Sequence, residues 1–282
     1  SFRVLIPDVQ KLVDQSMPRE RSGPRQVSGG YVYTEYHPME EVMKNLSLLV
    51  YFVVFCSVNA TAGNCISQPS NKPKKIIWMD CGIHAREWIS PAFCQWFVKE
   101  ILQNYKTDPK ISRFLQNLDL YVLPVNFLVP SAPVLYISPL IQCLYSSPGV
   151  GISFNCSSDI FCGSGPESEP ETKASDIVCY LTIHSYGQLI LTPYGSTTKP
   201  PSNNEELMQV AKEAAAALTG KYGTSYKVGS TALILYSNSG SSRDWAHTIG
   251  IPLSYTFELR DTGAHGFVLP ANQIQPTCEE TM

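Results

Sequence analysis

The chain has few charged residues: Asp, Glu, Lys and Arg make up 16% of its 282 residues, against about 25% in an average soluble protein. Two stretches, residues 45–71 and 120–158, contain none of them. Hydrophobic residues make up 44% of the chain, which excludes an intrinsically disordered protein. The net charge of −3, from 21 basic and 24 acidic residues, provides no basic excess for binding a phosphate backbone. We therefore expect no nucleic-acid partner.

Long apolar runs and several common catalytic motifs are also missing. The run over residues 46–58 is too short for a membrane-spanning helix, and the run over residues 127–144 is interrupted by three prolines. The sequence contains no phosphate-binding loop, no Cys-x-x-Cys pair and no Gly-x-Ser-x-Gly elbow. Neither a transmembrane helix nor any of these three chemistries is expected.

Cysteine, by contrast, is abundant. The chain has nine cysteines, and three Asn-x-Ser/Thr triplets begin at Asn45, Asn59 and Asn155. Disulfides and N-linked glycans both belong to oxidising, extracellular compartments. We expect a secreted or cell-surface-anchored glycoprotein with disulfides, in which the odd cysteine count leaves at least one thiol unpaired.

The first 30 residues differ in composition from the rest. Apolar side chains at helical spacing over residues 5–13, with Pro7 in the first turn, predict a short amphipathic helix. Residues 17–30 are rich in Pro, Ser and Gly. Three arginines lie in this segment: Arg19, Arg21 and Arg25. It is either an ordinary solvated loop or an exposed linker suited to cleavage by a trypsin-like protease.

The rest of the sequence alternates strand and helix signals. Apolar runs predict strands over residues 76–79, 118–125, 177–183 and 253–259. One helix is predicted to begin at Ser90 as N-cap, with Pro91 in its first turn. A second is predicted from Ser202, which forms a capping-box pattern with Glu205, to Gly220. Such alternation favours an α/β domain with helices over a sheet.

His84 and Glu87 lie three residues apart, between the first predicted strand and the helix that follows it. In a helical turn this spacing places an imidazole and a carboxylate on one side, about 5–6 Å apart at their Cβ atoms. Such a pair suits two ligands of one Zn²⁺. An incidental surface pair has the same spacing, so the motif alone is half of a site.

The remaining histidines are the candidates for a third ligand: His37, His184, His247 and His265. His184 ends the apolar strand over residues 177–183, a position where α/β proteins place functional groups. A structural histidine in the core fits the same pattern. Two histidines, one glutamate and an open position for water form a catalytic zinc site.

Glu258 is the candidate general base. Period-two alternation over residues 253–259 places it on one strand face with Ser254 and Thr256. A hydrolytic zinc site needs such a carboxylate close to the reacting water but not bound to the metal. Glu258 could equally pair with Arg260 on the same face, and the spacing does not distinguish the two.

Three motifs, taken together and in order, carry a family resemblance. They are WMDCGIHAREWISP over residues 78–91, IHSYG over 183–187 and YTFELRDTG over 255–263. The chain resembles the zinc metallocarboxypeptidases of the carboxypeptidase A/B type. The resemblance implies an α/β fold, a central twisted mixed parallel and antiparallel sheet flanked by helices, with parts of the family fold replaced or missing. It also implies one Zn²⁺ per chain and removal of residues from peptide C-termini.

Position by position, the resemblance makes His84, Glu87 and His184 the zinc ligands. It makes Glu258 the base that activates a zinc-bound water. Cys81 and Cys94 match a family disulfide that closes the zinc loop.

The resemblance also assigns residues to the substrate. Arg86 matches a residue beside the substrate path, and Ser185 with Tyr186 matches a subsite wall. Tyr236 matches a mobile tyrosine that closes over the bound C-terminus, and Arg243 takes the specificity position. A guanidinium there would prefer a substrate ending in Asp or Glu. Without the resemblance, Arg243 would be taken for an exposed helix residue.

The resemblance divides the chain into a propeptide tail with activation linker, residues 1–30, and a catalytic domain, residues 31–282. Segments 45–66 and 126–155 are not family-like. The second lies where the family carries an oxyanion-binding Arg and an Asn-Arg pair for the substrate carboxylate, yet no Arg or Lys occurs between Arg113 and Lys173. One oxyanion donor alone is worth ~10²–10³ in rate.

Two functional hypotheses follow. The first is a zinc exopeptidase that removes acidic C-terminal residues. The second is a zinc-binding relative with impaired catalysis that acts at most as a peptide-binding module. A third reading, in which the three motifs only pack a core, requires a coincidence at three separate places.

Overall fold

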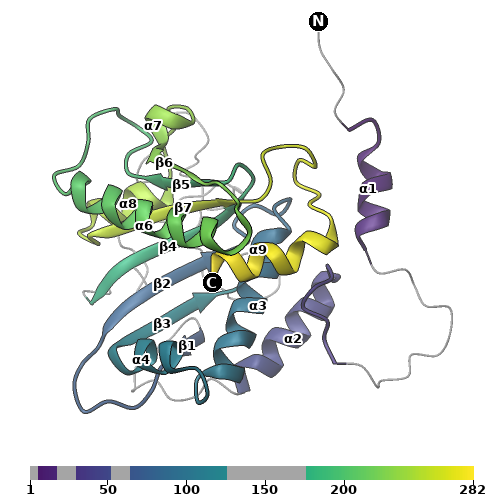
Figure 1. The fold of residues 1–282 in the computed structure, drawn as a ribbon, viewed down its shortest axis with the longest axis horizontal. Helices are drawn as coiled ribbons and strands as arrows, with labels where there is room; N and C mark the ends of the chain where they lie inside the picture. The colour runs from purple at the N-terminus through teal and green to yellow at the C-terminus, as the bar shows by residue number, and fades with distance from the viewer. Residues whose placement is uncertain (1–5, 18–29, 52–63, 126–175) are drawn as a thin grey trace, which may run out of the picture.

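The structure, a computed structural model, describes residues 6–17, 30–51, 64–125 and 176–282. In this part of the chain the centre is a seven-stranded sheet (Figure 1). The strands are β1 (Asn64–Ile66), β2 (Lys75–Cys81), β3 (Leu118–Leu123), β4 (Ile177–Ser185), β5 (Leu189–Thr192), β6 (Lys227–Ser230) and β7 (Leu253–Leu259). Their spatial order is β1-β3-β2-β4-β7-β5-β6. Two neighbouring pairs, β1–β3 and β5–β7, are antiparallel and the others are parallel, which confirms the predicted mixed sheet.

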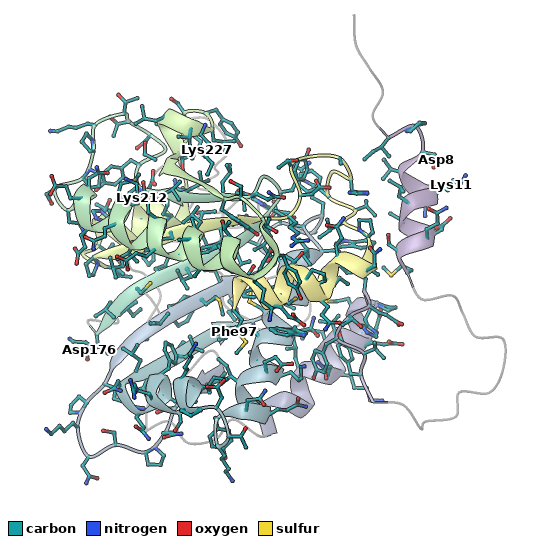
Figure 2. All side chains as sticks on the ribbon, viewed as in Figure 1. Asp8, Lys11, Phe97, Asp176, Lys212 and Lys227 are labelled. Carbon is teal, nitrogen blue, oxygen red and sulfur yellow. A yellow bond between two sulfur atoms is a disulfide. The ribbon has the colours of Figure 1, made fainter. Side chains whose placement is uncertain are left out.

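Helices flank the sheet on both faces. The described helices are α2 (Met39–Tyr51), α3 (Ile89–Asn104), α4 (Pro109–Asn117), α6 (Asn204–Tyr222), α7 (Thr231–Ile234), α8 (Ser242–Thr248) and α9 (Ile274–Thr281), with a 3₁₀ turn, η2, over Ala271–Gln273. A further helix, α1 (Val9–Ser16), buries no residue and lies apart from the sheet (Figure 1). The main core lies where α3, α9 and the central strands meet, and Phe97 of α3 packs against it, whereas Lys212 of α6 is exposed (Figure 2). In the described residues no helix combines the length and the apolar character that crossing a bilayer requires.

The period-two alternation of β4 separates an apolar face from a polar one. Ile183 joins the core around α3, while Tyr180, on the other face, packs against Trp245 and Ala246 of α8. Thr182 and His184 share the face of Tyr180, because residues two apart in a strand point the same way. The functional candidates therefore lie on the α8 side of the sheet.

Several predicted helix ends are wrong by a few residues. Asp8 caps α1 by accepting from the backbone N–H of Lys11, so Pro7 precedes the helix. The N-cap of α6 is Asn203 and not Ser202, and no side chain caps it. The same helix runs past Gly220 to Gly223, whose φ of +75° and lack of a Cβ suit a left-handed C-cap.

One predicted glycosylation site is buried. Asn45, on α2, accepts a hydrogen bond from Tyr33 and donates one to Gln95. The folded chain therefore leaves no room for a glycan on Asn45. The other two triplets, the arginine-bearing linker and segment 126–155 lie outside the described residues, as does most of segment 45–66.

Candidate functional site

The loop between β2 and α3 carries the first motif, and Ser90 has a different role there from the one predicted. Helix α3 begins at Ile89, so Ser90 lies in its first turn and is not the N-cap. Its hydroxyl accepts from the backbone N–H of Gly82 and donates to the carbonyl of Ile183 at 2.5 Å. The disulfide between Cys81 and Cys94, which the resemblance implied, is present. The loop is thus joined to α3 covalently and to β4 through Ser90.

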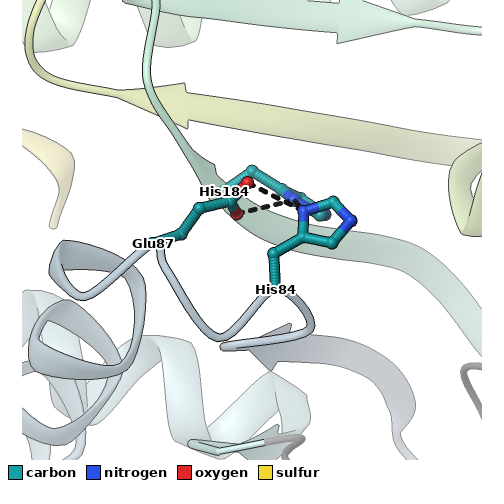
Figure 3. A group of neighbouring side chains, drawn as sticks. All are labelled: His84, Glu87 and His184. Carbon is teal, nitrogen blue, oxygen red and sulfur yellow. Dashed lines mark hydrogen bonds and ion pairs between the residues drawn. The ribbon is translucent and has the colours of Figure 1, made fainter. Parts of the chain in front are cut away.

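His84, Glu87 and His184 come together at this loop (Figure 3). The two carboxylate oxygens of Glu87 lie 2.7 Å from Nδ1 of His84 and 2.9 Å from Nδ1 of His184. The two Nδ1 atoms are 3.2 Å apart, and each residue offers a ligand atom within 4.8 Å of the others. Glu87 and His184 are buried, whereas His84 is exposed.

Two nitrogen donors and one carboxylate fit zinc well. A tetrahedral ion with bonds of about 2.0–2.1 Å holds its ligand atoms roughly 3.3 Å apart, close to the spacing of the two Nδ1 atoms. Three protein ligands leave the fourth position open, which is the arrangement of catalytic sites. The side chain of His84 is 58% exposed, so this cluster can be reached from solvent.

The three side chains also shift one another's protonation. Burial alone would raise the pKa of Glu87, but hydrogen bonds from His184 and His84 lower that pKa to about 2. Burial alone would lower the pKa of His184, yet Glu87 holds that pKa above its usual value. Glu87 is therefore a carboxylate at neutral pH, as a metal ligand must be.

Glu258 lies beside this cluster on β7. The parallel register pairs it with His184 on β4, so the two residues are neighbours across the strands. Burial raises the pKa of Glu258 to about 7; the nearby His184 opposes the rise and Glu87 adds to it. Arg260 pairs with Glu280 and not with Glu258, so the ion pair that the strand spacing also allowed for Glu258 is not formed.

Arg243 is buried and not an exposed helix residue. Its Nε and Nη2 donate to one carboxylate oxygen of Asp244, at 3.0 and 2.8 Å, and its Nη1 donates to Thr256 at 3.0 Å. Only 2% of Arg243 is exposed. Because Thr256 and Glu258 share a face of β7, the guanidinium lies next to the strand face that carries Glu258.

Of the other predicted substrate residues, Arg86 and Tyr186 contact the same aromatic ring, whereas Tyr236 is exposed. The guanidinium carbon of Arg86 lies 4.1 Å from the ring centroid of Phe267, and the ring of Tyr186 packs edge-on against the same ring at 4.9 Å. The hydroxyl of Ser185 is buried and has no hydrogen-bond partner among the described residues. Tyr236 is 62% exposed and, within the described part of the chain, forms no hydrogen bond or ring contact.

Sequence reasoning missed several residues that complete the site. Phe267 joins two candidate substrate residues, and Asp244 holds Arg243. Asp80 and Thr182 form hydrogen bonds that lead to His184. A signal was available for Thr182, which lies two residues before His184 and so on the same strand face.

Comparison with known proteins identifies the family. The zinc carboxypeptidase family model matches residues 56–126 and 145–282. Human carboxypeptidase O is 53% identical over 291 aligned positions that cover 89% of this chain and 78% of that protein, and bovine carboxypeptidase O is 49% identical, covering 99% and 84%. Bovine carboxypeptidase B is 45% identical and covers 76% of this chain and 57% of its own length.

Solved structures agree with the sequence comparisons. The crystal structure of thrombin activatable fibrinolysis inhibitor superposes with a TM-score of 0.77 at 32% identity, covering 99% of this chain and 79% of that one. The bovine form of that protein, in complex with tick carboxypeptidase inhibitor, superposes with a TM-score of 0.67 at 32% identity, covering 88% and 94%. Fold, family match and sequence identity together establish that this chain belongs to the zinc carboxypeptidase family, a family of metallocarboxypeptidase hydrolases.

Proposed function

We propose that this chain holds one Zn²⁺ through His84, Glu87 and His184 and removes acidic residues from peptide C-termini. The convergence of these three side chains within 4.8 Å carries the proposal. When bound, zinc would act as a Lewis acid and lower the pKa of a water at the open position. The family match supplies the expectation of zinc.

Glu258 is the proposed general base. It lies next to His184 across the strands but accepts no hydrogen bond among the described residues, so its carboxylate is free to take a proton from the attacking water. A pKa of about 7 suits a group that must accept a proton and release it again near neutral pH.

Arg243 supports the preference for acidic C-termini. A guanidinium has five N–H donors, of which Asp244 and Thr256 use three. Counting only partners in the described part of the chain, two donors remain, enough for one substrate carboxylate in a bidentate pair. We also propose that Arg86 lies along the substrate path, that Ser185 and Tyr186 line a subsite, and that Tyr236 closes over the bound C-terminus.

The proposed activity is slower than that of a complete family site. No Arg or Lys occurs between Arg113 and Lys173, so the family's oxyanion and terminal-carboxylate cations are missing there. Loss of one such donor lowers the rate by ~10²–10³. The same observation supports the alternative, a protein that binds zinc and a peptide C-terminus without turnover.

The proposed setting is extracellular, either secreted or anchored at the cell surface. The Cys81–Cys94 disulfide supports it, because disulfides persist in oxidising compartments. We propose that residues 1–30 are the tail of an inhibitory segment and that a trypsin-like protease releases it by cleaving at the arginines of the linker.

The test combines metal content with turnover. Purified chain is expected to bind one zinc and to release Glu from a blocked dipeptide. Glu258→Gln should retain zinc and lose about 10²–10⁴-fold in kcat. Glu205→Gln, at an exposed position of α6, is the matched control and should change neither value. Full activity in Glu258→Gln would refute the assigned base, and zinc without turnover in the unsubstituted chain would select the alternative.

A further inference from the structure

Asp80 is a buried carboxylate next to the proposed metal centre. It lies on β2, one residue before Cys81, and is 2% exposed. Among the described residues it forms no ion pair; it accepts hydrogen bonds from the hydroxyls of Tyr180, at 2.5 Å, and Thr182, at 2.8 Å. Burial raises the pKa of Asp80, and the two hydroxyls and the nearby His184 oppose that rise. Burying a carboxyl group at this depth is costly, so its position calls for an explanation.

The hydroxyl of Thr182 connects Asp80 to His184. The parallel register pairs Asp80 with Thr182 across β2 and β4. The Oγ1 atom of Thr182 lies 3.0 Å from Nε2 of His184, two residues further along the same strand face. A continuous hydrogen-bonded path therefore runs from Asp80 through Thr182 to one ring nitrogen of a proposed zinc ligand.

The direction of each hydrogen bond follows from a count of protons. A hydroxyl has one proton to donate, and a carboxylate only accepts. Thr182 therefore donates to Asp80 and accepts from His184, which requires the ring proton of His184 on Nε2. Its Nδ1 is then the nitrogen that faces Glu87 and His84, at 2.9 and 3.2 Å.

We propose that Asp80, acting through Thr182, is a positioning residue that sets the ring orientation and tautomer of His184 and so presents Nδ1 to the metal. The inference rests on the proposed function, since the metal is what Nδ1 binds. It concerns one ligand in particular, because in the described part of the chain Nε2 of His84 has no hydrogen-bond partner and the side chain is 58% exposed. Among the described residues both ring nitrogens of His184 have a partner before a metal binds, whereas only Nδ1 of His84 does.

Zinc affinity measures this effect without relying on catalysis. The probe is Zn²⁺ alone, competed against a chelator of known affinity. Thr182→Val removes the hydroxyl at nearly constant volume and is expected to weaken zinc binding 10–100-fold. Thr182→Ser restores the hydroxyl and should recover affinity to within about threefold of the unsubstituted chain. Thr182→Ala provides the same test if Thr182→Val does not fold.

Two further variants separate the path from general packing. Tyr180→Phe removes the other hydrogen bond to Asp80 while leaving Thr182 and His184 in contact, so it should change zinc affinity less than Thr182→Val. Asp80→Asn should weaken zinc binding in the unsubstituted background and have no additional effect in the Thr182→Val background, because the path is already broken there.

The outcomes are distinguishable. Unchanged zinc affinity in folded Thr182→Val or Thr182→Ala overturns the positioning role and leaves the proposed function standing. Equal losses in Thr182→Val and Thr182→Ser also overturn it, since a hydroxyl would then not matter. Failure of the unsubstituted chain to bind zinc overturns both proposals.

Discussion

Two arginine–carboxylate pairs lie near β7, and they differ in what surrounds them. Arg243 pairs with Asp244 on α8, and both side chains are almost fully buried. Arg260, just after β7, pairs with Glu280 on α9; the arginine side chain is 14% exposed and the glutamate fully buried. The N–H groups of Arg260 without a protein partner can reach water, whereas those of Arg243 are sealed from it.

The two carboxylates differ in their hydrogen-bond partners. Glu280 accepts hydrogen bonds from Nε and Nη2 of Arg260, from the hydroxyl of Thr224 and, at 3.3 Å, from Tyr226. It therefore connects the end of β7 to α9 and to the segment between α6 and β6. Asp244 binds Arg243 with one oxygen and the backbone N–H of Gly195 with the other. An arginine paired with a carboxylate thus forms a structural connection in one place and leaves donors for a ligand in the other.

The largest expected effect comes from breaking the Arg260–Glu280 pair, called the structural pair below. Glu280→Gln leaves Arg260 without its charged partner and should lower the free energy of unfolding by about 3 kcal/mol, measured by urea denaturation. Zinc content and the preference between Glu-terminated and Ala-terminated substrates should stay unchanged. A change in that preference would show that the two pairs are not separate in function.

The next largest expected effect comes from replacing Arg243, the arginine beside the proposed site. Arg243→Gln should reduce the ratio of kcat/KM for Glu-terminated over Ala-terminated peptides by roughly 10–100-fold, because a hydrogen bond to a charged group is worth about 1.5–3 kcal/mol. Zinc binding should persist, since none of the proposed ligands contacts Arg243. An unaltered ratio would remove Arg243 from the specificity position.

The pH dependence of stability, through the pKa of Glu258, also distinguishes the two arginine–carboxylate pairs. Burial raises the pKa of Glu258 from 4.5 to about 7, and Arg243, but not Arg260, opposes that rise. The folded, metal-free chain therefore holds a proton that the unfolded chain has lost between these values, and its stability falls as the pH rises from about 4.5 to 7. Glu258→Gln abolishes this loss and should be more stable than the unsubstituted chain by about 1–2 kcal/mol at pH 8, but not at pH 4.

That difference is checked by denaturation of the metal-free proteins at the two pH values. Equal stability of the two chains at pH 8 would contradict a raised pKa of Glu258. The Arg243→Gln variant should show a still steeper loss with pH, because a cation that favours the ionised carboxylate is gone.

The smallest expected effect is at the residue beside the structural pair. Glu279, next to Glu280 on α9, interacts with Tyr222 and with Lys221, whose side chain is half exposed. Glu279→Gln should change the free energy of unfolding by less than about 1 kcal/mol, because exposed ion pairs contribute little. If Glu279→Gln lost as much stability as Glu280→Gln in the same denaturation measurement, burial would not explain why one ion pair contributes more to stability than the other.

Features that depend on residues close together in the sequence were predicted more reliably than features that depend on long-range contacts. Local periodicity placed Ser254, Thr256 and Glu258 on one face of a strand whose bounds, Leu253–Leu259, the structure reproduces. The motifs and their resemblance indicated the His84, Glu87 and His184 cluster and the disulfide, both of which the fold assembles. Helix ends were less predictable, because Ser90 serves β4 through a long-range hydrogen bond and not the helix N-terminus.

The sequence by itself determined the family, the face of each strand to which a side chain points, and the set of side chains able to hold a metal. Motifs and periodicity depend only on residues close together in the sequence. Only the tertiary structure decided that Arg260 pairs with Glu280, that Arg243 is buried against Asp244, and that Asp80 reaches His184 through Thr182. Strand periodicity specifies which face a side chain points to. Which remote element covers that face depends on the order of the strands, and in this sheet that order brings together residues a hundred positions apart.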